Sequence, residues 1–339
     1  MRIKRFFKYF GISIAILVGG FLVAGQIAYH SIADVDSPPG KMYSVNGGEI
    51  HMHCTGPEND EKPTIIIISG AGTPSFLYSY LQEKLSETVR TCSYDTAGIA
   101  WSKANDIPYT AKNMSSELHQ LLKTAQIDGP IILAGHSMGG IVSLIYSAEY
   151  EEQVAGIVFI DSSHYNQVDY FGKEFRDTLE KQDEEELTSL WWMEFSSKLG
   201  ITKMMNNFDT SMSEIEREEY KMMESFDKWN PPYSTMRSMI SNFNLSFEQG
   251  KDVHYDRGNL PIIAISASGI VSDDHLSSEI GGVSEEELSK GFIELHKDLA
   301  ELSTNGRHVI VEETDHFSMV FNDETAEHIL SLIPLIEEK

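Results

Sequence analysis

The run Ile131–Gly140 reads IILAGHSMGG, and it places one serine, Ser137, between Gly135 and Gly139. A G-x-S-x-G spacing presents a nucleophilic serine when it forms the sharp turn between a strand and a helix. A strand-like run precedes Ser137, and an apolar run with helical character follows it. The pattern therefore predicts a nucleophile at Ser137. The amide of Met138, at the start of that helix, is then placed to stabilise a developing oxyanion.

A serine hydroxyl becomes a nucleophile when a neighbouring imidazole takes its proton. The chain has 12 histidines. His316 is a candidate base; it follows a β-rich run and lies in a short loop before the last helical segment. His136 lies inside the serine motif and is expected to point away from the position of a base. His164 and His275 are weaker candidates.

The elements that must position these residues alternate between strand and helix patterns. Such alternation indicates a mostly parallel sheet with helices on both faces. The pattern breaks at residues 162–258, which are rich in charged residues, methionine and aromatics and predict a helical cap. The core is thus expected at residues 49–161 and 259–339. Its strand-like runs are residues 48–54, 63–69, 89–95, 130–136, 154–161, 260–268 and 307–313.

Four segments together resemble the α/β-hydrolase superfamily, and the resemblance covers nearly all of residues 41–339. It implies an α/β-hydrolase fold with a mostly parallel eight-stranded sheet, flanking helices and a cap. It also implies a serine hydrolase with His316 as the predicted base, since that residue lies in the segment similar to the family's catalytic-histidine loop, and with no need for a metal or organic cofactor. Shorter runs (HMHCTG, IDSSH and ELSTNGRHVIVEETDHF) are similar to a group of exported or membrane-anchored bacterial hydrolases. The four segments are IIIISGAGTPS (65–75), SYDTAGIAWS (93–102), GHSMGG (135–140) and EETDHFSMVFND (312–323).

The resemblance implies a third catalytic group, an acid that orients the imidazole. The usual acid of the family follows the strand after the cap, but here only Asp273 and Asp274 come several residues later. The family also uses the end of the strand that follows the nucleophile helix, where this chain has Asp161. Catalytic groups belong at such strand tips in an open α/β sheet. Asp161 is therefore the predicted acid, with Asp273 or Asp274 as the alternative.

The loop after the third strand should supply the second oxyanion donor. Many relatives have His-Gly there, whereas this chain has Ser69 and Gly70. Because backbone amides stabilise the oxyanion, having Ser69 in place of histidine does not prevent this loop from acting as an oxyanion donor. The predicted donor is the amide of Ala71, with Gly72 as the alternative.

The two cysteines, Cys54 and Cys92, lie on the second and fourth strands that the resemblance implies. These strands are neighbours and antiparallel in that fold, which brings paired residues within disulfide range. A Cys54–Cys92 disulfide is therefore predicted. His51 and His53 alternate on the same strand, but no carboxylate or cysteine stands at ligand spacing, so no metal site is predicted.

The N-terminus differs from the rest of the chain. Residues 1–8 carry four cations, and residues 9–29 carry no charge. About 20 apolar residues span a bilayer core. Residues 1–30 are therefore predicted to be a basic N-terminus and transmembrane signal anchor, with residues 31–48 as a linker. The basic cluster keeps the N-terminus cytoplasmic and places the catalytic domain outside. A cleaved signal peptide is the alternative, and the protein is then secreted.

The formal net charge of −26 argues against a nucleic-acid partner, which would need a basic face. The expected activity is that of a carboxylesterase or lipase-like enzyme acting on a small ester. Methionines and tryptophans of the cap predict a pocket for apolar acyl or aromatic groups. Cleavage of an amide or peptide, a lactone or a carbon–carbon bond remains an alternative, as does a non-catalytic ligand sensor.

Overall fold

The computed structural model describes residues 37–58, 62–199, 201, 232–269 and 279–337, with isolated positions between 9 and 27. Most of the predicted span, residues 9–29, therefore lies outside the described residues. Within the described part of the chain, no helix has the length and apolar character needed to cross a membrane.

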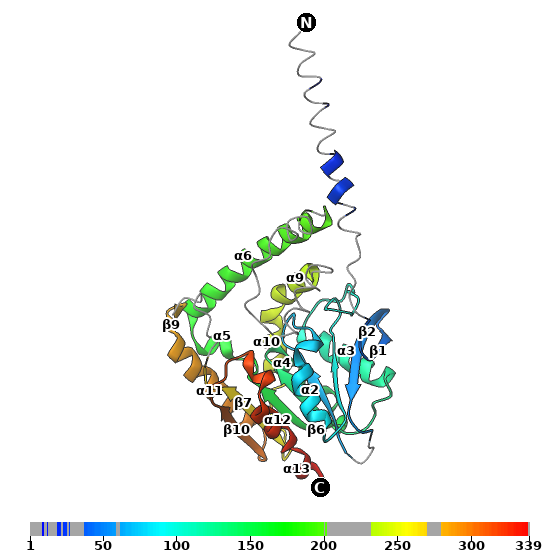
Figure 1. Cartoon of the computed structure of the whole chain (residues 1–339). Coiled ribbons are helices and arrows are strands. Elements are labelled where there is room, and N and C mark those ends of the chain that lie inside the picture. Colours follow the sequence, from blue (N-terminus) through cyan, green and yellow to red (C-terminus); the bar gives the residue numbers. More distant parts are fainter. Residues whose placement is uncertain are drawn as a thin grey trace.

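The centre of the molecule is an eight-stranded sheet with the order β1-β2-β4-β3-β5-β6-β7-β10 (Figure 1). From β4 to β10 neighbouring strands are parallel, and β2 runs antiparallel to both β1 and β4. The predicted mostly parallel eight-stranded sheet is thus confirmed. The strands are β1 (Lys41–Val45), β2 (Gly48–Thr55), β3 (Thr64–Ile68), β4 (Thr91–Tyr94), β5 (Ile131–His136), β6 (Val154–Ile160), β7 (Ile262–Ala267) and β10 (Gly306–Val311).

Helices cover both faces of the sheet, because central strands such as β3 and β5 are apolar on both sides. One apolar cluster joins the sheet to α3 (Ala111–Thr124), α4 (Met138–Glu149) and α11 (Glu285–Glu301). A second cluster joins the opposite face to α2 (Ser79–Ser86), α12 (Asp323–Leu330) and α13 (Ile333–Glu337). The sheet is therefore the rigid middle layer of the molecule. The residues that follow its parallel strands lie together at one edge of this layer.

The described part of the predicted cap is helical. It comprises α5 (Gln167–Tyr170), α6 (Lys173–Lys198), α9 (Tyr233–Ser241) and α10 (Phe243–Asp252). Long α6 packs against α9, and α10 packs on α3 and α4 (Figure 1). Residues 202–231 lie outside the described residues. The cap therefore rests on the core through α9 and α10.

Two details differ from the sequence expectation. Lys41–Val45, placed in the predicted linker 31–48, forms β1 and pairs with β2, so the core begins before residue 49. Its register is set by the tight turn at Asn46 and Gly47, both with positive φ. A two-stranded ribbon, β8 (Glu279–Ile280) with β9 (Val283–Ser284), was also not predicted.

A disulfide joins Cys54 of β2 to Cys92 of β4, the pairing that was predicted. The two residues face each other directly in the antiparallel register, with their Cα atoms 4.0 Å apart. The bond ties the antiparallel edge of the sheet to its parallel centre.

Candidate active site

Ser137 lies on the turn between β5 and α4, with φ 52° and ψ −125°. A non-glycine residue with positive φ is strained, and such strain gathers at functional sites. The flanking glycines make the turn possible. A Cβ at Gly135 would stand 2.4 Å from the carbonyl oxygen of Gly139, and one at Gly139 would stand 2.2 Å from that of Ile68. The spacing seen in the sequence is therefore a steric requirement of the turn.

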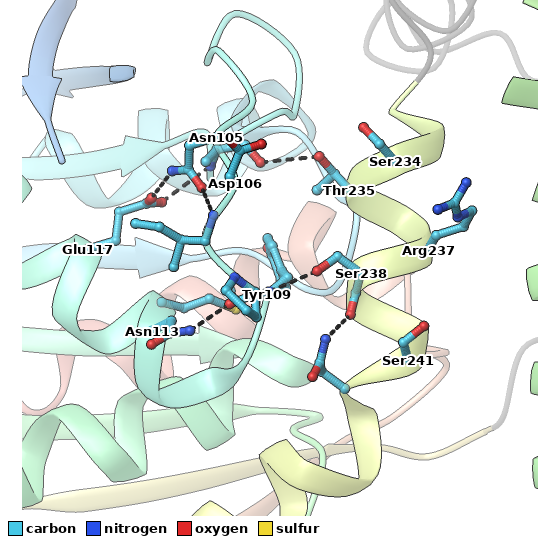
Figure 2. Close-up of a pocket in the computed structure, with 15 residues that line it drawn as sticks. Asn105, Asp106, Tyr109, Asn113, Glu117, Ser234, Thr235, Arg237, Ser238 and Ser241 are labelled. Carbon is cyan, nitrogen blue, oxygen red and sulfur yellow. Dashed lines mark hydrogen bonds between the residues drawn. The ribbon is translucent and has the colours of Figure 1, made fainter. Parts of the chain in front are cut away.

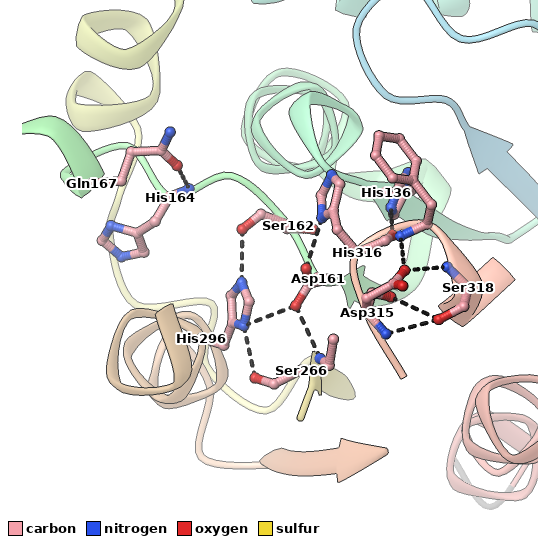
Figure 3. Close-up of polar contacts among 12 residues, drawn as sticks. His136, Asp161, Ser162, His164, Gln167, Ser266, His296, Asp315, His316 and Ser318 are labelled. Carbon is pink, nitrogen blue, oxygen red and sulfur yellow. Dashed lines mark hydrogen bonds and ion pairs between the residues drawn. The ribbon is translucent and has the colours of Figure 1, made fainter. Parts of the chain in front are cut away.

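Asp161 follows β6 and also has positive φ, 39°. Its Oδ2 lies 2.7 Å from Nδ1 of His316, and its Oδ1 accepts a hydrogen bond from the amide of Ala267 at 3.0 Å (Figure 3). The alternative acids, Asp273 and Asp274, lie outside the described residues, as does His275. The structure thus places Asp161, the predicted acid, within hydrogen-bonding distance of His316, the predicted base.

The charge of Asp161 follows from these contacts. Burial alone would raise its pKa, but the hydrogen bond with His316 and the nearby His296 hold the pKa down, at about 2. Asp161 is therefore a carboxylate at neutral pH and accepts a hydrogen bond from the Nδ1–H of His316. That leaves Nε2 of His316 as the proton acceptor.

The loop of His316 is held by a compact turn that the sequence reasoning missed. Oδ1 of Asp315 accepts hydrogen bonds from the amides of Phe317 and Ser318 at 2.9 and 2.8 Å. The amide of Asp315 in turn donates to Oγ of Ser318 at 2.8 Å (Figure 3). Asp followed by Ser three residues on is a recurrent turn signal and could have predicted it.

Ser137, Asp161 and His316 line one cavity of about 270 Å³. Ser137 also lines a second cavity of about 220 Å³, together with Met138 and Ala71. The serine therefore lies where two cavities meet, with the imidazole on one side and the two predicted oxyanion donors on the other.

The oxyanion loop lies directly against the serine. A Cβ at Gly70 would stand 3.1 Å from Cβ of Ser137. Ala71 faces the cavity, whereas Gly72 has φ +70° and packs under the side chain of Met236 of the cap. Of the two predicted donors on this loop, the geometry favours Ala71.

A polar network behind Asp161 has no counterpart in the sequence motifs. Oγ of Ser266 lies 2.7 Å from Nδ1 of His296 and 2.8 Å from Nε2 of His308. His296 also contacts the carbonyl of Ser162 through Nε2 at 2.8 Å, and its Nδ1 lies 3.9 Å from Oδ1 of Asp161. Burial lowers the pKa of His296, and burial followed by the charge of His296 lowers that of His308 to about 4. The network is therefore neutral at neutral pH.

The expectation that His136 points away from the base is wrong, because its ring centroid lies 4.6 Å from that of His316. His164 and His51 lie elsewhere. Nε2 of His164 pairs with Asp298 of α11 at 2.9 Å and does not line the serine cavities. His51 is paired with Asp95 at 2.9 Å, a carboxylate partner that its sequence neighbours did not reveal. Across the described ranges, no group of three or more His, Cys, Asp or Glu side chains is arranged to hold a metal ion.

A separate cavity of about 420 Å³ opens between the loop before α3 and helix α9 (Figure 2). Glu117 lies at its base and accepts hydrogen bonds from the Ala97 amide at 3.2 Å and from Asn105 at 3.3 Å. Burial raises the pKa of Glu117. None of the predicted catalytic residues lines this cavity, so it belongs to the junction of cap and core.

Comparison with known proteins agrees with the fold. Among curated proteins, an uncharacterised YqjL protein of Bacillus subtilis is 28% identical over 36% of this chain and 47% of its own length. An AB hydrolase superfamily protein of Gibberella zeae is 32% identical over 30% of this chain and 33% of its own length. The chain thus spans less than half the length of these curated relatives.

Solved structures show the same fold at low identity. An enol-lactonase from Burkholderia xenovorans superposes with a TM-score of 0.58 at 17% identity, covering 86% of this chain and 99% of that one. A putative lipase from Acinetobacter baumannii gives 0.60 at 16% identity, covering 94% and 97%. The sequence model for the alpha/beta hydrolase fold matches residues 63–323, well over half of the chain. The chain therefore belongs to the alpha/beta hydrolase fold family.

Proposed function

We propose that the protein is a serine hydrolase of the carboxylesterase or lipase-like type, with Ser137, His316 and Asp161 as its catalytic triad. The observation that carries the proposal is the 2.7 Å contact of Asp161 with Nδ1 of His316. Both residues line a cavity with a serine held in a strained turn. That arrangement is the one in which an imidazole activates a serine.

In the proposed reaction, Oγ of Ser137 attacks the ester carbonyl while Nε2 of His316 takes its proton. The amides of Met138 and Ala71 stabilise the tetrahedral oxyanion, and Asp161 stabilises the imidazolium. His316 then protonates the leaving alcohol, and the acyl group stays on Ser137. Water, activated by His316, releases the acid and restores the serine.

The cavities support a substrate with two apolar groups of modest size. On the imidazole side the apolar lining is Phe292 and Ile293 of α11. On the oxyanion side, Phe243 and Phe247 of the cap line the wall. An ester with a short acyl or aromatic group on each side of the carbonyl fits this division. Neighbouring structures described as an esterase and a putative lipase are consistent with ester chemistry.

We also propose that the domain acts outside the cell membrane, anchored by residues 9–29 with the N-terminus cytoplasmic. The apolar run and the preceding cations support this topology. The Cys54–Cys92 disulfide adds support, because disulfides persist in oxidising compartments. Protease treatment of intact cells tests the proposal: the domain should be released, and protection of the domain would contradict it.

The reaction is tested by labelling with a fluorophosphonate and by a panel of short and long p-nitrophenyl esters. We expect labelling of the wild type and its loss in Ser137→Ala, with kcat reduced by about 10⁶-fold. Amide, lactone and carbon–carbon substrates in the same panel distinguish the alternative bond types. A well-folded wild type that takes no label and cleaves none of these substrates would contradict the enzyme and favour a ligand sensor.

A further inference from the structure

A chain of hydrogen bonds crosses the site beneath Ser137, through two residues that line neither serine cavity. The amide of Gly70 lies 2.9 Å from Oη of Tyr78, and that hydroxyl lies 2.8 Å from Nδ1 of His136. Nε2 of His136 lies 2.8 Å from the backbone carbonyl of His316. Tyr78 and His136 are both buried.

The chemistry of the end groups sets the direction of every bond. The His316 carbonyl only accepts, so Nε2 of His136 carries a proton and donates it. In neutral His136 the Nδ1 atom is then an acceptor, and the hydroxyl of Tyr78 donates to it. The Gly70 amide only donates, so Oη of Tyr78 accepts from it. Each member of the chain thus has one assigned role.

The two ends of the chain belong to the two parts of the site that must meet at the transition state. Gly70 precedes Ala71, which lines the oxyanion side of Ser137. His316 lies against Asp161 on the other side. Outside the helix, the backbone of Ser137 is hydrogen-bonded to Ile160, Gly140 and Ser163, and these bonds lead to neither end of the chain.

We propose that Tyr78 and His136 are positioning residues, which fix the distance between the oxyanion loop and the catalytic imidazole. The inference rests on the proposed function and extends it to two residues that touch no substrate. Since neither lines a serine cavity, their loss should reduce turnover and leave ground-state binding unchanged.

The electrostatics of His136 suit this role. Its ring centroid lies 4.6 Å from that of His316. Burial, followed by the charge of His316, lowers the pKa of His136 to about 3. His136 therefore stays neutral while His316 gains a proton, and it adds no positive charge beside the imidazolium.

The test compares Tyr78→Phe with Tyr94→Phe in the full chain. Tyr94 is a matched control, since it is also a buried tyrosine but its hydroxyl has no hydrogen-bond partner among the described residues. We expect Tyr78→Phe to lower kcat by about 10- to 100-fold with KM within about twofold, as for a small misplacement of reacting groups. Tyr94→Phe should keep the wild-type kcat and KM.

His136 is tested by rescue. His136→Leu removes the donor and the acceptor and should lower kcat at least as much as Tyr78→Phe. His136→Gln keeps an N–H donor and a carbonyl acceptor and should recover part of that loss. Thermal melts accompany each variant, and only variants that fold are compared. Equal losses in the Leu and Gln variants would contradict the assigned roles.

A second readout separates this inference from the proposed function. The Nδ1–H signal of His316 in nitrogen-15 NMR should shift in Tyr78→Phe and stay in place in Tyr94→Phe. If wild-type protein takes no fluorophosphonate, the proposed function fails, while the NMR signal still decides whether the chain positions His316. An unchanged signal, or a kcat for Tyr78→Phe equal to that of Tyr94→Phe, overturns the inference.

Discussion

The site is built from two halves that are made differently. The elbow half, residues 135–140, is shaped by close contacts between backbone atoms, so that added Cβ atoms at three of its positions would overlap other atoms. The acid half is shaped by polar contacts between side chains from two strands, one helix, the residue after a third strand and a loop. Its residues are Asp161, Ser266, His296, His308 and His316.

The difference predicts two kinds of response to mutation. Backbone atoms cannot move aside for an added side-chain atom as a flexible side chain can. The elbow half should therefore tolerate almost no added volume. Hydrogen bonds can be removed one at a time, so the acid half should respond in steps that depend on the distance from His316. The acid half contains several titratable groups and the elbow half one, His136, so the stability of the acid half should also depend more strongly on pH.

The largest step within the acid half is expected from Asp161→Asn. The amide keeps the shape but cannot hold His316 in the tautomer that leaves Nε2 free. We therefore expect kcat to fall by about 10⁴-fold with little change in stability. Steady-state kinetics on a p-nitrophenyl ester measure it.

The control is the double variant Asp273→Asn/Asp274→Asn, which replaces the alternative acids. It should keep kcat within a few-fold of the wild type. The reverse result, a large loss in the double variant and a small one in Asp161→Asn, would move the acid to residues 273–274.

The elbow half is tested by Gly139→Ala. Its Cβ would stand 2.2 Å from the carbonyl oxygen of Ile68, and backbone cannot yield as a side chain can. We expect the free energy of unfolding to fall by about 3 kcal/mol or more, with activity lost through displacement of Ser137. Gly129→Ala is the matched control, since nothing lies within 4 Å of its Cβ, and it should be near neutral. Equal urea midpoints for the two variants would contradict the steric account.

The two halves also differ in what a sequence can reveal. The elbow was predictable because its glycines lie within a few residues of Ser137, and their spacing follows from local sterics. The alternation of strand and helix patterns likewise predicted a mostly parallel sheet with a strand that ends at Asp161. Ser266, His296 and His308 carry no such signal. Packing of β7, β10 and α11 brings them together. In the sequence, Ser266 is 30 residues from His296 and 42 residues from His308.

The cap shows another limit of sequence patterns. The composition of residues 162–258 predicted a helical cap, but nothing in it indicated that Met236 would cover Gly72 or that Phe243 and Phe247 would line a cavity. Strand β1 was missed because Gly and Pro before it resemble a linker. Its pairing with β2 depends on a turn at Asn46 and Gly47 that only positive φ values identify.

A smaller step in the acid half is expected from Ser266→Ala. It leaves Nδ1 of His296 and Nε2 of His308 without their shared partner, which should cost about 1–3 kcal/mol of unfolding free energy. Because His296 lies beside Oδ1 of Asp161, we also expect kcat to fall about 3- to 10-fold, well short of the Asp161→Asn effect.

The control variant Ser303→Ala separates the effect of Ser266→Ala on stability from its effect on kcat. Oγ of Ser303 donates to the carbonyls of Leu260 and Gly258, near the start of β7 and away from the site. This variant should lose a similar free energy of unfolding and keep its kcat. If Ser266→Ala also keeps its kcat, the network behind Asp161 is structural only.

The smallest effect is the pH dependence of stability in the acid half. The pKa of His308 is lowered to about 4 in the folded protein, by burial first, then by His296 and Lys297 against an opposing effect of Glu294. Unfolded histidine titrates near 6.5, so between these values the unfolded chain binds more protons. Stability is therefore complete above about pH 6.5 and falls as the pH drops towards 4. Asp161, with its pKa at about 2, adds a further loss only below about pH 4.

The variant His308→Gln removes one of these titrations while keeping an N–H donor for Ser266. Urea unfolding at about pH 7 and about pH 5 should show a smaller loss of stability in the variant than in the wild type. The difference should be about 1 kcal/mol, because the half-exposed ring is partly screened by solvent. Gly129→Ala, which touches no titratable group, should keep the wild-type loss. Parallel losses in His308→Gln and the wild type would mean that the acid sensitivity arises from other buried histidines with lowered pKa values, namely His296 of this half and His136 of the elbow half.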